Sequence, residues 1–410
     1  MKKIIISVIG SNFAASGLGF LLNLLLARIL TVEEFGRINL LFSMIILLFS
    51  LFEFNFGNAV VIVFNKLKNK IKNSQNLLYK INFIYYIYLL IIMLIAWIII
   101  YIFQKIYSLT NFETLVLMID FYLFLIYRYI ISLYQALGNW KKYNFYNVLH
   151  NVMKITITIF SLVIGYYFFN ISKYISVLYG YIIYPIIFLA LILLSSTKYI
   201  RLKIHKDIRL IRYLFNVLIP LGISNIFIII SMRADNFIIE KFLGSYYVGI
   251  YAAANMLALL FPLITSGIRN VYLKIGAEHD DNFLNIIFNQ QKKYFPIVII
   301  IFIISEIIAK YLFVLIFGEN YIESVIVFQI LLIAYIGGIF FTPLESFFYS
   351  KKPILITKLK FLQMIIIILL GIVLVSKFSI MGMAYAIVIS RLVGWIYLLL
   401  LTIKRIRRDL

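Results

Sequence analysis

Residues 81–103 read INFIYYIYLLIIMLIAWIIIYIF, a run of 23 residues without a single Asp, Glu, Lys or Arg. An α-helix rises about 1.5 Å per residue, so a run of this length crosses the ~30 Å hydrocarbon core of a bilayer. Similar runs recur along the 410 residues, and 64% of the chain is hydrophobic whereas only 13% is charged. A soluble domain is about 45–50% apolar and about 25% charged. The sequence therefore predicts an all-α integral membrane protein.

The apolar runs and the polar breaks between them predict about twelve transmembrane helices. We expect these spans at residues 7–30, 38–64, 81–103, 112–137, 148–169, 174–195, 212–239, 246–268, 295–317, 324–349, 354–376 and 381–403. No connection between them is long enough to hold a soluble catalytic domain. Any function must therefore lie within the helical bundle, and we do not expect an enzyme.

The charge of the chain is strongly basic, with 38 Lys and Arg residues and a formal net charge of +22. A basic chain can indicate nucleic-acid binding, but here the bases gather in the connections that follow even-numbered spans. Examples are Lys66 to Lys72, Lys198 to Arg212 and the tail from Lys404. The positive-inside rule assigns these connections to the cytoplasm. We therefore expect cytoplasmic N- and C-termini, an attraction to anionic membrane lipids, and no nucleic-acid partner.

Residue types that bind metals or form disulfides are scarce. The chain has no cysteine, which excludes disulfides, thiolate catalysis and cysteine-ligated metals. Its three histidines, His150, His205 and His279, are too far apart in sequence to indicate a site. We expect no metal and no cofactor.

An internal repeat divides the chain. The segment LLLARILTVEEFGRINL (residues 24–40) is echoed by FIIEKFLGSYYVGIYAA (residues 237–253), and at this offset of 213 residues Gly36 matches Gly249. The offset predicts two pseudo-symmetric six-helix lobes, residues 1–205 with the start of a basic linker and residues 206–410, around a central cavity. The glycine in each copy predicts a turn or a close helix approach.

These segments carry a family resemblance. Residues 24–40, PLGISNIFIIISMRADNFIIEKFLGSYYVGIYAAANML (residues 220–257) and IFGENYIES (residues 316–324) resemble the bacterial polysaccharide-transporter family, which includes O-antigen and capsule-unit flippases. The resemblance implies a protein of the bacterial cytoplasmic (inner) membrane that moves an undecaprenyl-diphosphate-linked oligosaccharide to the outer leaflet by alternating access. It also implies glycan polymerase and glycosyltransferase partners. Its superfamily includes multidrug exporters, so a cation exporter is an alternative, and a membrane glycan polymerase is a third.

Bases at span depth are the candidate substrate-binding residues, because a charge inside the bilayer costs at least ~2.5 kcal/mol and must face protein, water or a partner. Arg391 and Arg128 lie deep in their spans, and Arg233 lies beside an acid. Arg28 matches an Ala-Arg pattern of the family. An arginine suits a diphosphate because its guanidinium forms bidentate contacts with phosphate oxygens. For each of them a structural role is the alternative. Lys154 is close enough to the cytoplasmic interface to extend its ammonium to it.

Acidic, proline and tyrosine residues inside spans complete the candidates. Asp235, at the family's acidic position, and Glu53 could bind a coupling ion, H⁺ or Na⁺, although an interhelical hydrogen bond explains either equally well. Pro220 shares a span with Asp235 and is a candidate gate, with a static kink as the alternative. Tyr85, Tyr86 and Tyr88 could stack on sugar rings.

Overall fold

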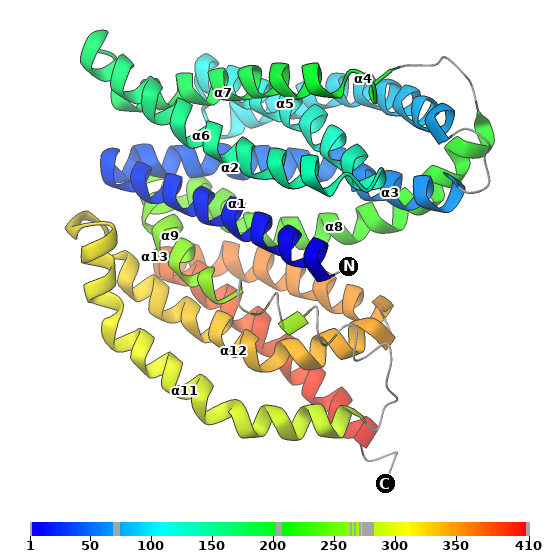
Figure 1. Ribbon diagram of the computed structural model, residues 1–410. Coiled ribbons are helices and arrows are strands. Elements are labelled where there is room, and N and C mark those ends of the chain that lie inside the picture. Colours follow the sequence, from blue (N-terminus) through cyan, green and yellow to red (C-terminus); the bar gives the residue numbers. More distant parts are fainter. Residues whose placement is uncertain are drawn as a thin grey trace. The chain divides into compact units, whose positions relative to one another are not determined.

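The computed structural model describes residues 2–68, 74–201, 207–262, 283–351 and 353–406, together with residues 265, 268, 269 and 272. This part of the chain is helical and contains no β-strand (Figure 1). Its α-helices are α1 (Lys2–Ile29), α2 (Val32–Glu53), α3 (Phe56–Leu67), α4 (Ser74–Ile106), α5 (Asn111–Ala136), α6 (Trp140–Phe168), α7 (Lys173–Ser196), α8 (Ile208–Leu243), α9 (Ser245–Ala258), α11 (Phe283–Ile316), α12 (Ser324–Lys351) and α13 (Pro353–Ile406), with the short 3₁₀ helix η2 (Glu319–Tyr321).

Eleven helical stretches within the described residues are long and apolar enough to cross a membrane. One of them, α13, has 54 residues, which corresponds to about 80 Å and is far too long for a single crossing. Its backbone is non-helical at Phe378 and Ser379, so α13 contains the two spans expected at 354–376 and 381–403. The prediction of an all-α membrane protein with about twelve spans is confirmed.

The two parts of α13 pack against each other after this break. Gly382 lies against the backbone of Leu374, and a Cβ at Gly382 would collide with the Leu374 carbonyl oxygen. Further along, the Gln363 amide donates to the Ser390 carbonyl oxygen at 3.2 Å, and the Ser390 hydroxyl donates to the Gln363 carbonyl oxygen at 3.1 Å. These reciprocal bonds satisfy polar groups inside the hydrocarbon region and hold the position next to Arg391.

The second expected span, 38–64, is interrupted in the structure. Helix α2 ends at Glu53 and α3 begins at Phe56, because Phe54 (φ 48°) and Asn55 (φ 66°) adopt left-handed backbone conformations. Asparagine tolerates this conformation better than most residues, whereas for phenylalanine it is strained. A break of this kind inside an apolar span gives no hydropathy signal.

The chain forms two compact units. The N-terminal unit contains residues 1–30 and 41–229, and the C-terminal unit contains residues 31–40 and 230–410. The first turns of α2 therefore belong to the C-terminal unit, and the first half of α8 belongs to the N-terminal unit. The division into lobes at residues 205 and 206 stays a prediction.

The core of the N-terminal unit is built around stacked aromatic rings. Tyr85 of α4 stacks on Tyr129 of α5 with ring centroids 3.6 Å apart, and both side chains are 3% exposed. The Tyr85 hydroxyl donates to the Leu125 carbonyl oxygen at 2.9 Å, and that of Tyr129 donates to Asn82 Oδ1 at 2.7 Å. Tyr85 is therefore a core residue, and the interpretation of it as a sugar-stacking residue is wrong.

The internal repeat corresponds to a repeated helix–turn–helix element. Helix α2 begins at Val32 and α9 begins at Ser245, which reproduces the offset of 213 residues. Within the C-terminal unit these two helix starts touch: a Cβ at Gly36 would collide with the Ser245 carbonyl oxygen, and one at Gly249 would collide with the Val32 carbonyl oxygen. The predicted close approach at the two glycines is confirmed, and each glycine lies against the other copy of the repeat.

Candidate functional site

Four bases and two acids of the C-terminal unit are connected by electrostatic interactions, either directly or through Tyr335 of α12; five of them lie on α8, α12 and α13, and the sixth is Arg269, between α9 and α11. We call them the basic cluster: Arg233, Asp235, Arg269, Glu345, Lys360 and Arg391. Arg391 is its central member, because its charge acts on Tyr335 and on Glu345, which are ten residues apart on α12. The side chain of Arg391 is partly exposed. Arg391, which the sequence places deep in an apolar span, therefore lies among other charges.

Lys360 and Glu345 form the ion pair of the basic cluster. Lys360 Nζ lies 2.9 Å from Glu345 Oε1, and the side chains are 21% and 23% exposed. The charges of Arg391 and Arg269 act on both partners. Among the described residues, one partly exposed carboxylate, Glu345, thus interacts with three bases of the cluster, so its negative charge does not balance theirs.

Arg233 and Asp235 lie at the other end of the basic cluster, on α8. Asp235 is 4% exposed; its Oδ1 accepts a hydrogen bond from the Asn236 amide at 2.8 Å, and it faces Tyr251 of α9. Arg233 is partly exposed. Both charges act on Tyr335, whose hydroxyl donates to Asn255 Oδ1 at 2.9 Å. The acid is thus enclosed by protein, whereas the neighbouring base remains accessible.

The chemical character of the basic cluster follows from its composition. Its bases outnumber its acids by two, and two of its bases are arginines placed inside membrane spans. Such a group of charges suits an anion with several oxygen acceptors, because Arg offers planar bidentate donors. Among the described residues there is no group of three or more His, Asp or Glu side chains that could hold a metal ion.

Glu53 and Arg128 lie together in the N-terminal unit, at the break between α2 and α3. Glu53 Oε1 accepts a hydrogen bond from the Gly57 amide at 2.7 Å, which caps the start of α3. The charge of Arg128 on α5 acts on Glu53, and its guanidinium lies 5.9 Å from the centroid of the Phe49 ring. Arg128 is exposed. Glu53 therefore has a structural task as a helix cap besides any role in ion coupling.

Pro220 lies within α8 close to the same break, and its own side chain is outside the described part of the structure. The next two residues contact the break. Gly222 lies against the Phe54 ring, where a Cβ would collide with ring carbons, and Asn55 Nδ2 donates to the Leu221 carbonyl oxygen at 3.4 Å. The irregular part of α2–α3 is thus packed on the turn that follows Pro220.

Lys154 of α6 lies inside an aromatic cage. Its Nζ is 4.0 Å from the centroid of the Phe42 ring and 4.8 Å from that of Tyr181, and the charge of Asp120 acts on it. Asp120 is 3% exposed and accepts a hydrogen bond from the Tyr184 hydroxyl at 2.8 Å. The ammonium lies among rings of the N-terminal unit instead of extending to the interface. Hydropathy gave no indication of this cage.

Arg28 is exposed in the last turn of α1, where a positive charge is favourable beside the C-terminal end of the helix dipole.

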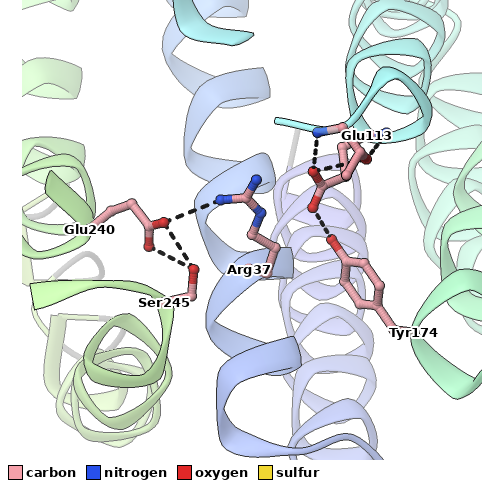
Figure 2. A network of polar contacts seen from close by, with 6 residues as sticks. Arg37, Glu113, Tyr174, Glu240 and Ser245 are labelled. Atoms are coloured by element: carbon pink, nitrogen blue, oxygen red, sulfur yellow. Dashed lines mark hydrogen bonds and ion pairs between the residues drawn. The ribbon is translucent and has the colours of Figure 1, made fainter. Parts of the chain in front are cut away.

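In the C-terminal unit, Arg37 Nη1 lies 3.2 Å from Glu240 Oε1, and the Ser245 hydroxyl donates to both oxygens of Glu240, at 2.9 and 3.0 Å (Figure 2). These contacts tie the start of α2 to α8 and α9. In the N-terminal unit, Figure 2 shows the Tyr174 hydroxyl donating to Glu113.

Sequence reasoning missed Glu345, Lys360 and Tyr335. Lys360 lies within the span expected at residues 354–376 and within α13, so it is a base at span depth, as Arg391 is. Glu345 is the one acid between residues 324 and 349. A lone carboxylate in an apolar span requires a basic partner, so this residue was a usable signal. Tyr335 gave none, because tyrosine is abundant throughout the chain.

Comparisons with known proteins agree with this architecture. The sequence matches the family described as polysaccharide biosynthesis protein over residues 1–273. A comparison with curated proteins finds no match. Among solved structures, the lipid II flippase MurJ in an inward closed conformation superposes with a TM-score of 0.71 at 17% identity, covering 97% of this chain and 87% of that one.

Multidrug transporters share the same fold. An inward-facing MATE family transporter of the MOP superfamily gives a TM-score of 0.69 at 14% identity, covering 96% of this chain and 95% of that one. A MOP superfamily transporter from Pyrococcus furiosus, described as having a binding pocket of reversed polarity, gives 0.58 at 15% identity and covers 99% and 96%. Because the family match extends over more than half of the sequence, the chain belongs to the polysaccharide biosynthesis protein family, and it is a multi-pass membrane protein with the fold of MOP-superfamily transporters.

Proposed function

We propose that this protein is a flippase that moves an undecaprenyl-diphosphate-linked oligosaccharide, an O-antigen or capsule unit, from the inner to the outer leaflet of the bacterial cytoplasmic membrane. The observation that carries this proposal is the basic cluster, in which intramembrane bases outnumber acids around Arg391. A diphosphate requires such a field when it leaves water, whereas a hydrophobic cation is repelled by it. Membership of a polysaccharide biosynthesis family and the shared fold with a lipid II flippase support the same conclusion.

In the proposed cycle the lipid-linked sugar enters from the cytoplasmic leaflet and its diphosphate contacts Arg391 and Arg233. Arg128 and Arg28 are proposed contacts elsewhere along the route. Asp235 and Glu53 are proposed to take up H⁺ or Na⁺, and Pro220 is proposed to let α8 bend between states. No chemical bond of the cargo changes, so the protein needs no catalytic residue or cofactor. Glycosyltransferases would supply the cargo and a glycan polymerase would consume it.

The central test is charge reversal at Arg391. We expect Arg391→Glu to abolish translocation of a lipid-linked oligosaccharide by the purified protein in vesicles, because the carboxylate would repel the diphosphate. Arg391→Lys keeps the charge but loses the bidentate contact and should lower the rate by about tenfold, which corresponds to ~1.4 kcal/mol. Lys377→Glu, in the exposed connection inside α13, is the matched control and should leave the rate unchanged. A wild-type rate in Arg391→Glu with normal yield would exclude this role.

A multidrug cation exporter is the competing proposal, and the shared fold with MATE transporters is the observation that favours it. The two proposals differ in the expected effect of removing carboxylates. A cation exporter should lose transport of a cationic dye in Asp235→Asn while Arg391→Gln retains it. Dye transport with that pattern, without movement of lipid-linked sugar by the wild-type protein, would replace the flippase proposal.

A further inference from the structure

The C-terminal unit contains a second feature, separate from the basic cluster. A groove with a volume of about 690 Å³ lies between α11, α12 and α13, within the range of ~300–1,000 Å³ that is usual for small-molecule sites. Its walls carry six aromatic side chains, Phe288, Phe295, Phe302, Phe340, Phe341 and Trp395. Lys292 is the one charged residue among the described residues that line it. We call this feature the aromatic groove.

The aromatic groove is built by specific contacts. The Trp395 indole stacks on the Phe341 ring with centroids 4.9 Å apart and an interplanar angle of 8°. Gly337 makes room for that indole, because a Cβ at Gly337 would collide with its ring carbons. Phe295 meets Phe340 edge-on at 5.5 Å. Contacts between side chains of three helices thus set the shape of the walls.

The walls of the aromatic groove include exposed apolar side chains. Phe295 is 48% exposed, Ile299 is 40% exposed and Ile333 is 43% exposed, although all three line the groove. In a membrane span, exposed apolar surface faces hydrocarbon chains. An apolar chain can therefore enter sideways from the bilayer without crossing polar protein.

The length of the groove equals the depth of one leaflet, and the charge of Lys292 lies at one end of it. From Lys292 to Phe302 on α11 is ten residues, or about 15 Å, which is half of the ~30 Å hydrocarbon core. Lys292 is an exposed residue, and its Nζ lies 4.6 Å from the centroid of the Phe288 ring. Leu398 and Leu401 of α13 pack in one cluster with Phe288, and the basic tail beginning at Lys404 follows them. The positive-inside rule assigns this end to the cytoplasm.

We propose that the aromatic groove binds the polyprenyl chain of a lipid phosphate in the inner leaflet, with the phosphate at Lys292. A single chain with one anionic end matches a groove that has one base at its mouth and apolar walls to the level of the bilayer midplane. A phospholipid carries two acyl chains on one glycerol and would leave one of them outside. The inference rests on the proposed function, because a lipid-linked cargo brings such a chain, and it adds a second site that holds the tail.

The test uses the purified full-length protein and farnesyl phosphate carrying a diazirine on its terminal isoprene unit. Irradiation should label side chains of α11 and α12 that line the aromatic groove, as mapped by mass spectrometry. Ile299→Trp fills the groove and should reduce labelling by at least about tenfold, or ~1.4 kcal/mol of binding. Ile300→Trp is the matched control: Ile300 is the next residue on α11, is 54% exposed and does not line the groove. Ile333→Trp fills the groove from α12 and guards against a folding defect in the first variant.

The role of the Lys292 charge is tested by a second pair of variants, one test and one control. Lys292→Glu should weaken the labelling several-fold, whereas Lys293→Glu changes the same charge at an exposed neighbour that does not line the groove and should leave it unchanged. Equal labelling in Ile299→Trp, Ile333→Trp and wild type would overturn the proposal. Competition by phosphatidylglycerol as strong as by unlabelled farnesyl phosphate would overturn the assignment to a polyprenyl chain.

The translocation assay separates this inference from the proposed function. Wild-type protein that moves lipid-linked oligosaccharide but shows no labelling in the groove would overturn the groove and leave the flippase intact. Protein that labels in the groove as expected but moves no lipid-linked sugar would overturn the flippase and leave the lipid site intact.

Discussion

Single charged residues inside the spans are held in different ways, and Lys154 is the clearest case. Its ammonium lies over the Phe42 and Tyr181 rings and interacts with the buried Asp120. An aromatic cage stabilises a desolvated cation by up to ~2 kcal/mol, and a nearby carboxylate adds to this. The N-terminal unit thus carries a compensated charge, in contrast to the excess of bases in the basic cluster.

We predict that Lys154 and Asp120 are energetically coupled. Lys154→Met and Asp120→Asn each remove one charge and leave the other in a low-dielectric site. The loss of unfolding free energy in the double variant should therefore be smaller, by about 1 kcal/mol, than the sum of the losses in the two single variants. The measurement is the free energy of unfolding in detergent. Glu113→Gln is the control, because Glu113 lies on α5 as Asp120 does but is bound to Thr110 and Tyr174. The losses of unfolding free energy caused by Glu113→Gln and Lys154→Met should simply add. Additivity of Lys154→Met with Asp120→Asn would contradict the coupling.

Ser379 is a residue whose backbone carries strain. Its φ of 55° and ψ of −143° lie in a region that glycine occupies easily and other residues do not. We expect Ser379→Gly to raise the free energy of unfolding by about 1 kcal/mol. The same substitution three residues earlier, Ser376→Gly in regular helix, should lower it by about 0.5–1 kcal/mol. Two changes of the same sign would show that the connection is not strained.

At the scale of elements, the repeated helix–turn–helix copies are joined where glycines remove side chains. Gly36 lies on the backbone of Ser245 and Gly249 lies on that of Val32. The ion pair between Arg37 and Glu240 lies at the same junction. Close backbone contact between helices is a usual source of packing energy inside membranes, where the hydrophobic effect between helices is weak.

Gly36→Ala and Gly249→Ala should therefore each destabilise the protein by about 1–3 kcal/mol, because a methyl group has no room between the two helix starts. The thermal unfolding midpoint and the yield of monodisperse protein would measure this effect. Gly10→Ala is the matched control in an open part of α1, where a Cβ meets no atom within 4 Å, and it should stabilise the helix slightly. A neutral result at Gly36 would mean that α2 and α9 adjust at little cost.

At the scale of the whole molecule, the alternation of basic and less basic connections predicts how the chain is threaded through the membrane. The absence of cysteine makes this prediction easy to test, because a single introduced cysteine is the only reactive thiol. Cytoplasmic termini and an even number of spans require that Lys105 and Lys377 lie outside and that Lys68 and Lys404 lie inside. All four side chains are exposed in the structure.

We expect Lys105→Cys and Lys377→Cys to react in intact cells with a maleimide that cannot cross the membrane. Lys68→Cys and Lys404→Cys should react only after the cells are permeabilised. Labelling is read on the purified protein, and normal yield confirms that each variant is inserted. Reaction of Lys404→Cys in intact cells would place the C-terminal end of α13 outside and contradict the predicted orientation.

The sequence by itself determined the all-α class, the number of membrane spans as about twelve, and the internal repeat. A long apolar run is a local property that needs no tertiary partner, and the offset of 213 residues reappears in the first residues of α2 and α9. It also shows that Arg233, Asp235 and Arg391 are charges inside apolar spans, because such a charge is visible in the linear sequence; their functional roles stay predictions.

Only the tertiary structure decided which charges meet. Lys360 pairs with Glu345, Lys154 lies in a cage of rings, Tyr85 is buried, and α2 breaks at Phe54. Neighbours across helices depend on how each helix is rotated about its axis. When a helix is apolar on every side, its sequence carries little information about that rotation, and packing between helices sets it.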